Sequence, residues 1–169
     1  MQCFNILIFS LEEVIKYKGY NQNIISIYDC FDFNQKQDFM IDENQTNCSY
    51  YHKLSNYVIR TKIIICPNIL IINLNREKGL NYDLKLSFIE YLEIKKYIFY
   101  SSSPHYYELV GVVSYLNSSD KSGHLIAFCR NSENCKWYKF DDAIVSESNI
   151  QEVLNFGVSY VLFYNSVKC

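Results

Sequence analysis

The sequence is short of the two residues that usually mark turns. Its 169 residues include only 5 glycines and 2 prolines, whereas isoleucine, asparagine, lysine and tyrosine are abundant. Asparagine must therefore occupy turn positions that glycine normally fills, which makes turns hard to place. The apolar fraction of 49% is ordinary for a globular protein. We expect a single unit, residues 1–169, with a substantial hydrophobic core.

An excess of charge of one sign is also missing. The net charge is −2, and lysines and arginines are scattered along the chain. Nucleic-acid partners require clustered cations, so none is predicted. The absence of an acidic tract likewise argues against a disordered acidic tail.

Long hydrophobic runs are absent too. The run Ile63–Ile72 is interrupted by Pro67 and Asn68, and it is far shorter than the ~20 residues of a membrane helix. The apolar run near the N-terminus has no cationic segment before it, and Glu12 and Glu13 end it. We expect a soluble protein of the cytoplasm or nucleus, with no membrane partner.

The seven cysteines contain no CxxC pair. An odd number of thiols in a reducing compartment favours free side chains, most of them buried. The spacing leaves a disulfide between Cys129 and Cys135 open. Neither a metal site nor a cofactor is predicted.

Short runs of β-branched and aromatic residues, separated by polar segments, predict a sheet. The run Tyr106–Leu116 is apolar on both faces, as expected for a central strand. Strands are predicted at Phe4–Phe9, Tyr57–Cys66, Ile69–Asn75, Leu84–Phe88, Leu92–Ile94, Tyr106–Leu116, His124–Arg130, Lys136–Phe140 and Ser159–Tyr164.

Helices are predicted to be few and short. One follows Ser10, and another spans Ser148–Phe156 with Ser148 or Asn149 as its cap. Ile24–Asp32 fits a helix or a strand, and Asp32–Tyr51 fits a loop or a loose hairpin. The expected fold class is α+β, mainly antiparallel sheet with a few short helices.

The segment Gly123–Asp142, GHLIAFCRNSENCKWYKFDD, carries the chemistry. A hairpin with a four-residue loop pairs Arg130 with Cys135 and places His124 opposite Asp141. Directly opposed side chains lie roughly 4.5–5.5 Å apart at Cβ, within reach of a hydrogen bond. A slip of one residue brings Asp142 opposite instead. Such a pair supplies a general base and the acid that orients it.

Several blocks in series resemble the C-terminal half of the catalytic domain of ubiquitin-specific proteases, which is a papain-like cysteine peptidase fold. YELVGVVSYLNSSDKSGHLIAFCR is similar to the segment around that family's active-site histidine. WYKFDD with Val145 is similar to its "W-x-x-F-D-D-x-x-V" block, and YVLFY to its terminal strand. CPNILIINLNR and the fainter SIYDCF match upstream blocks.

The resemblance implies roles for individual residues. His124 would be the general base and Asp141 its partner, with Asp142 beside it. Gly123 would leave room for the glycine-rich tail of ubiquitin. Leu125 stands where the family usually has a tyrosine that touches substrate, and Trp137 would mainly pack, with a secondary role at the site. The residues Ser118–Ser122 match a loop that borders the tail channel.

The family's nucleophile block, Gly-Asn-Thr-Cys, has no counterpart in this sequence. Three interpretations follow. The first is a partial deubiquitinating protease whose thiol comes from an N-terminal half of the domain. The second is an inactive relic that binds ubiquitin, ubiquitinated proteins or another protein. The third is a chain that folds poorly alone because one face of its sheet is uncovered.

Overall fold

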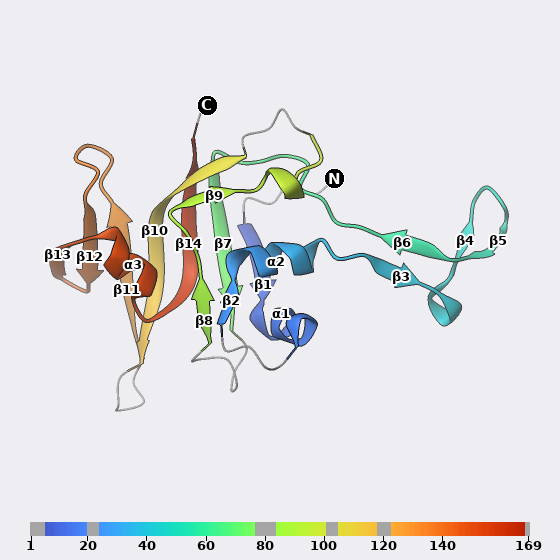
Figure 1. Cartoon of the computed structure of the whole chain (residues 1–169), viewed down its shortest axis with the longest axis horizontal. Coiled ribbons are helices and arrows are strands. Elements are labelled where there is room, and N and C mark those ends of the chain that lie inside the picture. The colour runs from blue at the N-terminus through green and yellow to red at the C-terminus, as the bar shows by residue number, and fades with distance from the viewer. Residues whose placement is uncertain (1–5, 20–23, 77–83, 101–104, 118–122, 168–169) are drawn as a thin grey trace.

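The computed structural model describes residues 6–19, 24–76, 84–100, 105–117 and 123–167. Their main feature is an eight-stranded sheet in the order β1-β7-β14-β10-β11-β12-β13, with β9 paired to β10 (Figure 1). Only β1 and β7 are parallel neighbours in it. The predicted α+β class with a mainly antiparallel sheet is therefore confirmed. The strands of this sheet are β1 (Ile6–Ser10), β7 (Ile69–Asn75), β9 (Tyr91–Glu93), β10 (Tyr106–Asn117), β11 (Gly123–Arg130), β12 (Trp137–Asp141), β13 (Ile144–Ser148) and β14 (Val158–Ser166).

One face of this sheet carries the α-helices of the described chain, which are α1 (Leu11–Lys18), α2 (Ile27–Asn34) and α3 (Ile150–Asn155) (Figure 1). Phe9 of β1 packs on Phe31 of α2 with ring centroids 5.2 Å apart. Phe128 of β11 packs on Phe156, just after α3, at 4.9 Å. The pairing register puts Phe9 and Phe128 on the same face, so the buried core lies between this face and the helices.

Each of the three α-helices that the structure describes begins directly after a polar residue whose side chain caps it. Ser10 precedes α1 and accepts a hydrogen bond from the amide of Glu13, as predicted. Ser26 and Asp29 form a reciprocal capping box at α2. Asn149, one of the two predicted caps, accepts from the amide of Glu152 at the start of α3. Side-chain acceptors thus satisfy amides that would otherwise lack a partner at each helix start.

Two short ribbons form an arm that extends away from the sheet (Figure 1). In it β3 (Asp38–Met40) pairs with β6 (Tyr57–Ile59), and β4 (Thr46–Cys48) pairs with β5 (Lys53–Ser55). The short 3-10 turn η1 (Asp42–Asn44) connects β3 to β4.

The arm and its surroundings differ from several predictions. The predicted strand Tyr57–Cys66 ends at Ile59, because beyond it the described chain finds only an isolated bridge between Ile63 and Ile98. Ile24–Asp32 is both a strand and a helix, since β2 (Ile24–Ser26) runs directly into α2. β2 pairs in parallel with β8 (Lys85–Ser87), and η2 (Lys95–Tyr97) follows β9.

Strand β13 was not predicted, because its residues Ile144–Ser148 follow β12 after a turn with little hydrophobic alternation. The cysteines described by the structure are free, including Cys129 and Cys135. Within the described ranges, none of the helices combines the length and apolar content needed to span a bilayer.

The capping box of α2 makes a stability prediction. Ser26 Oγ accepts from the Asp29 amide at 3.2 Å, and the Ser26 amide donates to the Asp29 carboxylate at 2.8 Å. Ser26→Ala should lower the free energy of unfolding by about 1 kcal/mol, because the Asp29 amide at the helix start loses its acceptor. Urea denaturation measures this loss. The control Ser55→Ala, on the arm, should change it by less than about 0.5 kcal/mol, and equal losses would contradict the assignment.

Candidate active site

The hairpin of β11 and β12 has a longer connection than predicted. Arg130 pairs with Trp137 and Ala127 with Phe140, so six residues connect the strands instead of four. The side chain of Asn131 organises this connection by accepting hydrogen bonds from two backbone amides within it. The predicted pairing of Arg130 with Cys135 is therefore wrong, and so is the direct opposition of His124 and Asp141.

The two side chains nevertheless meet on one face, because the predicted and observed registers differ by two residues. A shift by an even number keeps every side chain on its own face of the sheet. Continuing the observed register places Asp141 across from Ile126, which makes it a diagonal neighbour of His124. Diagonal neighbours on one face remain within reach of long side chains.

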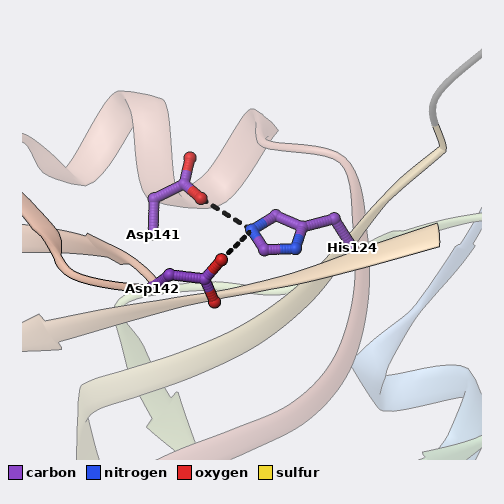
Figure 2. Close-up of side chains that lie close together, drawn as sticks. All are labelled: His124, Asp141 and Asp142. Carbon is purple, nitrogen blue, oxygen red and sulfur yellow. Dashed lines mark hydrogen bonds and ion pairs between the residues drawn. The ribbon is translucent and has the colours of Figure 1, made fainter. Parts of the chain in front are cut away.

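Figure 2 shows the resulting contact. His124 Nε2 lies 2.6 Å from Asp141 Oδ1. Asp142 approaches the same nitrogen, with Oδ2 at 4.0 Å. Its backbone φ of 51° lies in the left-handed region, at the turn between β12 and β13. The side chains of His124 and Asp141 are 38% and 37% exposed, so the pair is open to a reactant from outside.

This contact decides which ring nitrogen of His124 can act as a base. A carboxylate accepts hydrogen bonds, so Asp141 favours the tautomer with the proton on Nε2. The lone pair then resides on Nδ1, and Nδ1 has no hydrogen-bond partner among the described residues. Any proton that the ring takes from a reactant must therefore arrive at Nδ1.

Of the other predicted site residues, Gly123 and Leu125 adjoin His124 in β11, whereas Trp137 pairs with Arg130 at the far end of the hairpin and is not brought to the pair. Leu125 is 57% exposed on the sheet face opposite His124, as strand alternation requires. Trp137 is 4% exposed and packs in the core. Gly123 opens β11, and the ring of Tyr115 lies where a Cβ of residue 123 would be. The predicted loop Ser118–Ser122 lies outside the described residues.

A cleft near this pair was not predicted, because it is built from distant segments. Its volume is about 400 Å³, and it lies between β2, β8 and the end of α3, lined by Ile24, Leu86, Gln151 and Gly157 among others. Gly157 comes directly before β14, which pairs with β10, and β10 pairs with β11. One end of the cleft is thus two strands away from His124.

The buried side chain of Arg76 supports the wall of this cleft. Its Nε donates to the carbonyl of Ser159 and its Nη1 to the carbonyl of Leu84. The guanidinium also lies 5.7 Å from the ring centroid of Tyr160. Burial lowers the pKa of Arg76 from its ordinary value. In the sequence this arginine ends the block CPNILIINLNR, but no pattern in the sequence indicates these contacts.

The thiols of the described chain show no sign of activation. Burial raises the pKa of Cys30 to about 12. Burial also raises the pKa of Cys66, and partial desolvation of the thiol raises that of Cys129, although Cys129 as a residue is exposed. In the described ranges no cysteine sulfur is hydrogen-bonded to His124, and Cys3 and Cys169 lie outside those ranges. The pair therefore has the geometry of a base and its orienting acid, without a described nucleophile.

Comparisons with known proteins match the chain to a protein family and to several solved structures. A family model described as ubiquitin carboxyl-terminal hydrolase matches residues 1–164. The structure resembles a chain of the SAGA DUB module of Ubp8, Sgf11, Sus1 and Sgf73 bound to monoubiquitin, with a TM-score of 0.77 and 26% identity. It also resembles the module bound to ubiquitin aldehyde, with a TM-score of 0.75 and 27% identity.

A yeast SAGA DUB module with a mutant Sgf73 is similar as well, with a TM-score of 0.71 and 30% identity. Each of these matches covers 98% of the present chain and 36% of the solved chain. The chain thus spans about a third of the length of the solved proteins it resembles.

Gly123 and Tyr115 give a test of the local packing. A methyl group at residue 123 would overlap the Tyr115 ring, so Gly123→Ala should cost about 1–3 kcal/mol of unfolding free energy. In a Tyr115→Ala background the same change should cost less than about 0.5 kcal/mol, because the obstacle is gone. A double-mutant cycle by chemical denaturation measures the coupling. Equal costs in both backgrounds would show that the ring does not occupy this volume.

Thiol reactivity offers a second test. The thiolate is the reactive form, so a buried thiol with a raised pKa alkylates slowly. In the native chain Cys30 should remain unmodified by iodoacetamide at pH 7.5, whereas the exposed Cys135 should react. Peptide mass spectrometry gives the extent at each position, with the urea-unfolded chain as control. Comparable native rates at the two positions would contradict the burial of Cys30.

Proposed function

The chain belongs to the ubiquitin carboxyl-terminal hydrolase family, and from this membership we propose that it is the part of a deubiquitinating cysteine protease domain that carries the general base. The observation that carries the proposal is the 2.6 Å contact between His124 and Asp141, which leaves Nδ1 as the proton acceptor. The proposed partners are ubiquitin and ubiquitinated proteins, and an N-terminal half of the domain that supplies the thiol.

In the proposed reaction Nδ1 of His124 removes the proton of the incoming thiol, and Asp141 stabilises the imidazolium that forms. The thiolate attacks the carbonyl carbon of the terminal glycine of ubiquitin, whose bond to the amine is the one that breaks. The imidazolium then gives its proton to the leaving amine, and a thioester remains. Water deprotonated by the same nitrogen hydrolyses this thioester, which releases the ubiquitin carboxylate and returns the thiol.

The cleft beside α3 supports a peptide substrate. Its apolar members include Ile24, Leu86 and Phe156, and its polar members include Gln151 and Ser159. Its exposed lining is more polar than apolar. Such a lining suits an extended chain, because polar groups can pair with its backbone while the apolar side chains contact its surface. We place the ubiquitin tail along this cleft, since one end of it approaches His124 across β10.

The second candidate is a binding protein without catalysis. The observation that favours it is the lack of a described thiol beside His124, because a base without its nucleophile cannot form an acyl-enzyme. It predicts that ubiquitin binds to the chain, while no covalent adduct with ubiquitin forms.

A thiol-trapping probe separates the two functions. The product of the longest transcript that contains this sequence is incubated with ubiquitin vinyl sulfone, and adduct formation is followed by gel shift. The protease predicts an adduct that His124→Ala abolishes and that Asp141→Asn slows by roughly 10²- to 10⁴-fold, because the ring loses its orienting carboxylate. The matched control His52→Ala, on the arm, should label at the rate of the unmodified protein.

Two outcomes would overturn the protease. One is the absence of an adduct although ubiquitin binds by calorimetry, which would assign the chain to the binding function. The other is an adduct whose rate is unaffected by His124→Ala, which would show that the trapped thiol does not use this base.

A further inference from the structure

His124, Asp141 and Asp142 form a compact group of metal-ligating side chains. One ligand atom from each residue lies within 4.8 Å of the other two. Figure 2 shows the two carboxylates approaching the same nitrogen of the ring. In the part of the chain that the structure describes, no other set of three histidine, cysteine or acidic side chains meets this spacing.

The two distances from the His124 nitrogen to the carboxylates are close to those of a metal site. Zinc binds imidazole nitrogen and carboxylate oxygen at about 2.0–2.2 Å, so tetrahedral ligands are separated by about 3.4 Å. The nitrogen of His124 lies 2.6 Å from Asp141 and 4.0 Å from Asp142, on either side of that value. Both adjustments are below about 1 Å, and the side chain of Asp142 is 86% exposed and has room to rotate.

The charges suit a divalent cation. Two carboxylates and one neutral imidazole balance a charge of +2. Neither Asp141 nor Asp142 pairs with a lysine or arginine among the described residues, so no cation of the protein has to be displaced. Imidazole nitrogen favours zinc and its transition-metal neighbours over magnesium and calcium, which prefer oxygen ligands alone.

We propose that His124, Asp141 and Asp142 bind a divalent transition metal, with Zn²⁺ as the best fit, and that this ion switches off the base. The first part rests on the cluster alone, and the second part rests on the proposed function. The remaining coordination positions would take water, because the side chains of all three residues are exposed to solvent in part or for the most part.

Inhibition follows from the ring's two nitrogens. In the metal-free chain the proton is on Nε2, where it is donated to Asp141, and Nδ1 holds the lone pair. A metal binds through the lone pair of Nε2, so the proton of the neutral ring moves to Nδ1. Nδ1 is then a donor and cannot accept the proton of a thiol. The ion therefore blocks the base without contacting the nucleophile.

The test titrates Zn²⁺ into the full chain and follows its three histidine rings by ¹⁵N-edited NMR. The protein used for the titration carries both Cys129→Ser and Cys135→Ser, because exposed thiols also bind zinc. The expected result is a saturable change of the His124 ring to the tautomer protonated at Nδ1. The rings of His52 and His105 are internal references and should not make this change.

The variant Asp142→Asn isolates the third ligand. It leaves the contact of His124 with Asp141 in place, and it should weaken zinc binding by about tenfold or more. The matched control Glu133→Gln removes an acidic side chain from the β11–β12 connection, at the other end of the hairpin, and should leave the affinity unchanged. Two results would overturn the metal site. One is a zinc affinity that Asp142→Asn does not alter. The other is a His124 ring that keeps its tautomer at about 1 mM Zn²⁺, which is roughly the dissociation constant of the weakest specific metal modules.

The metal site and the proposed function fail separately. If zinc binds as expected but no ubiquitin adduct forms in the metal-free protein, the site stands and the protease is refuted. If the adduct forms and zinc leaves its rate unchanged at saturation of the His124 ring, the inhibitory role is refuted while the protease stands.

Discussion

The position of His124, the proposed base, relative to Asp141 depends on the pairing of β11 with β12. A β-ribbon allows two side chains to share a face only when their register differs by an even number of residues. His124 and Asp141 satisfy this condition through a six-residue connection organised by Asn131. A connection one residue longer or shorter would carry Asp141 to the opposite face, and no rotamer of either side chain would restore the contact.

The two faces of the sheet have different roles. The face with the helices buries the core, and His124 lies at the end of this face, beyond the buried Ile126 and Phe128. The imidazole ring is thus anchored by a strand of the sheet but remains open to solvent. The opposite face exposes apolar side chains, among them Ile8 and Leu125. This exposure agrees with the interpretation that such a chain needs a covering partner.

Local rules predicted much of the fold. Ser10 and Asn149 are caps because their side chains accept backbone hydrogen bonds whatever the distant structure, and the strand over Tyr106–Leu116 was evident from its apolar run. The predicted length of the β11–β12 connection was wrong, because the hydrogen bonds of the Asn131 side chain determine where the loop begins and ends, and the alternation of residue types does not show them. The contacts of Arg76 depend on segments 8 and 83 residues away, which no local pattern encodes.

The contact between His124 and Asp141 was predicted correctly although the predicted strand register was wrong. Alternation fixes the face of each strand residue even when the register is uncertain by two, so the meeting of His124 with Asp141 was predicted whether the loop has four residues or six. The same argument explains the approach of Asp142. It stands where β12 ends, and its left-handed backbone frees it from the alternation that would otherwise send it to the other face. One ring nitrogen therefore faces two carboxylates and the other faces none. This asymmetry gives the imidazole a single basic position, and it also makes that position sensitive to any cation held between the carboxylates.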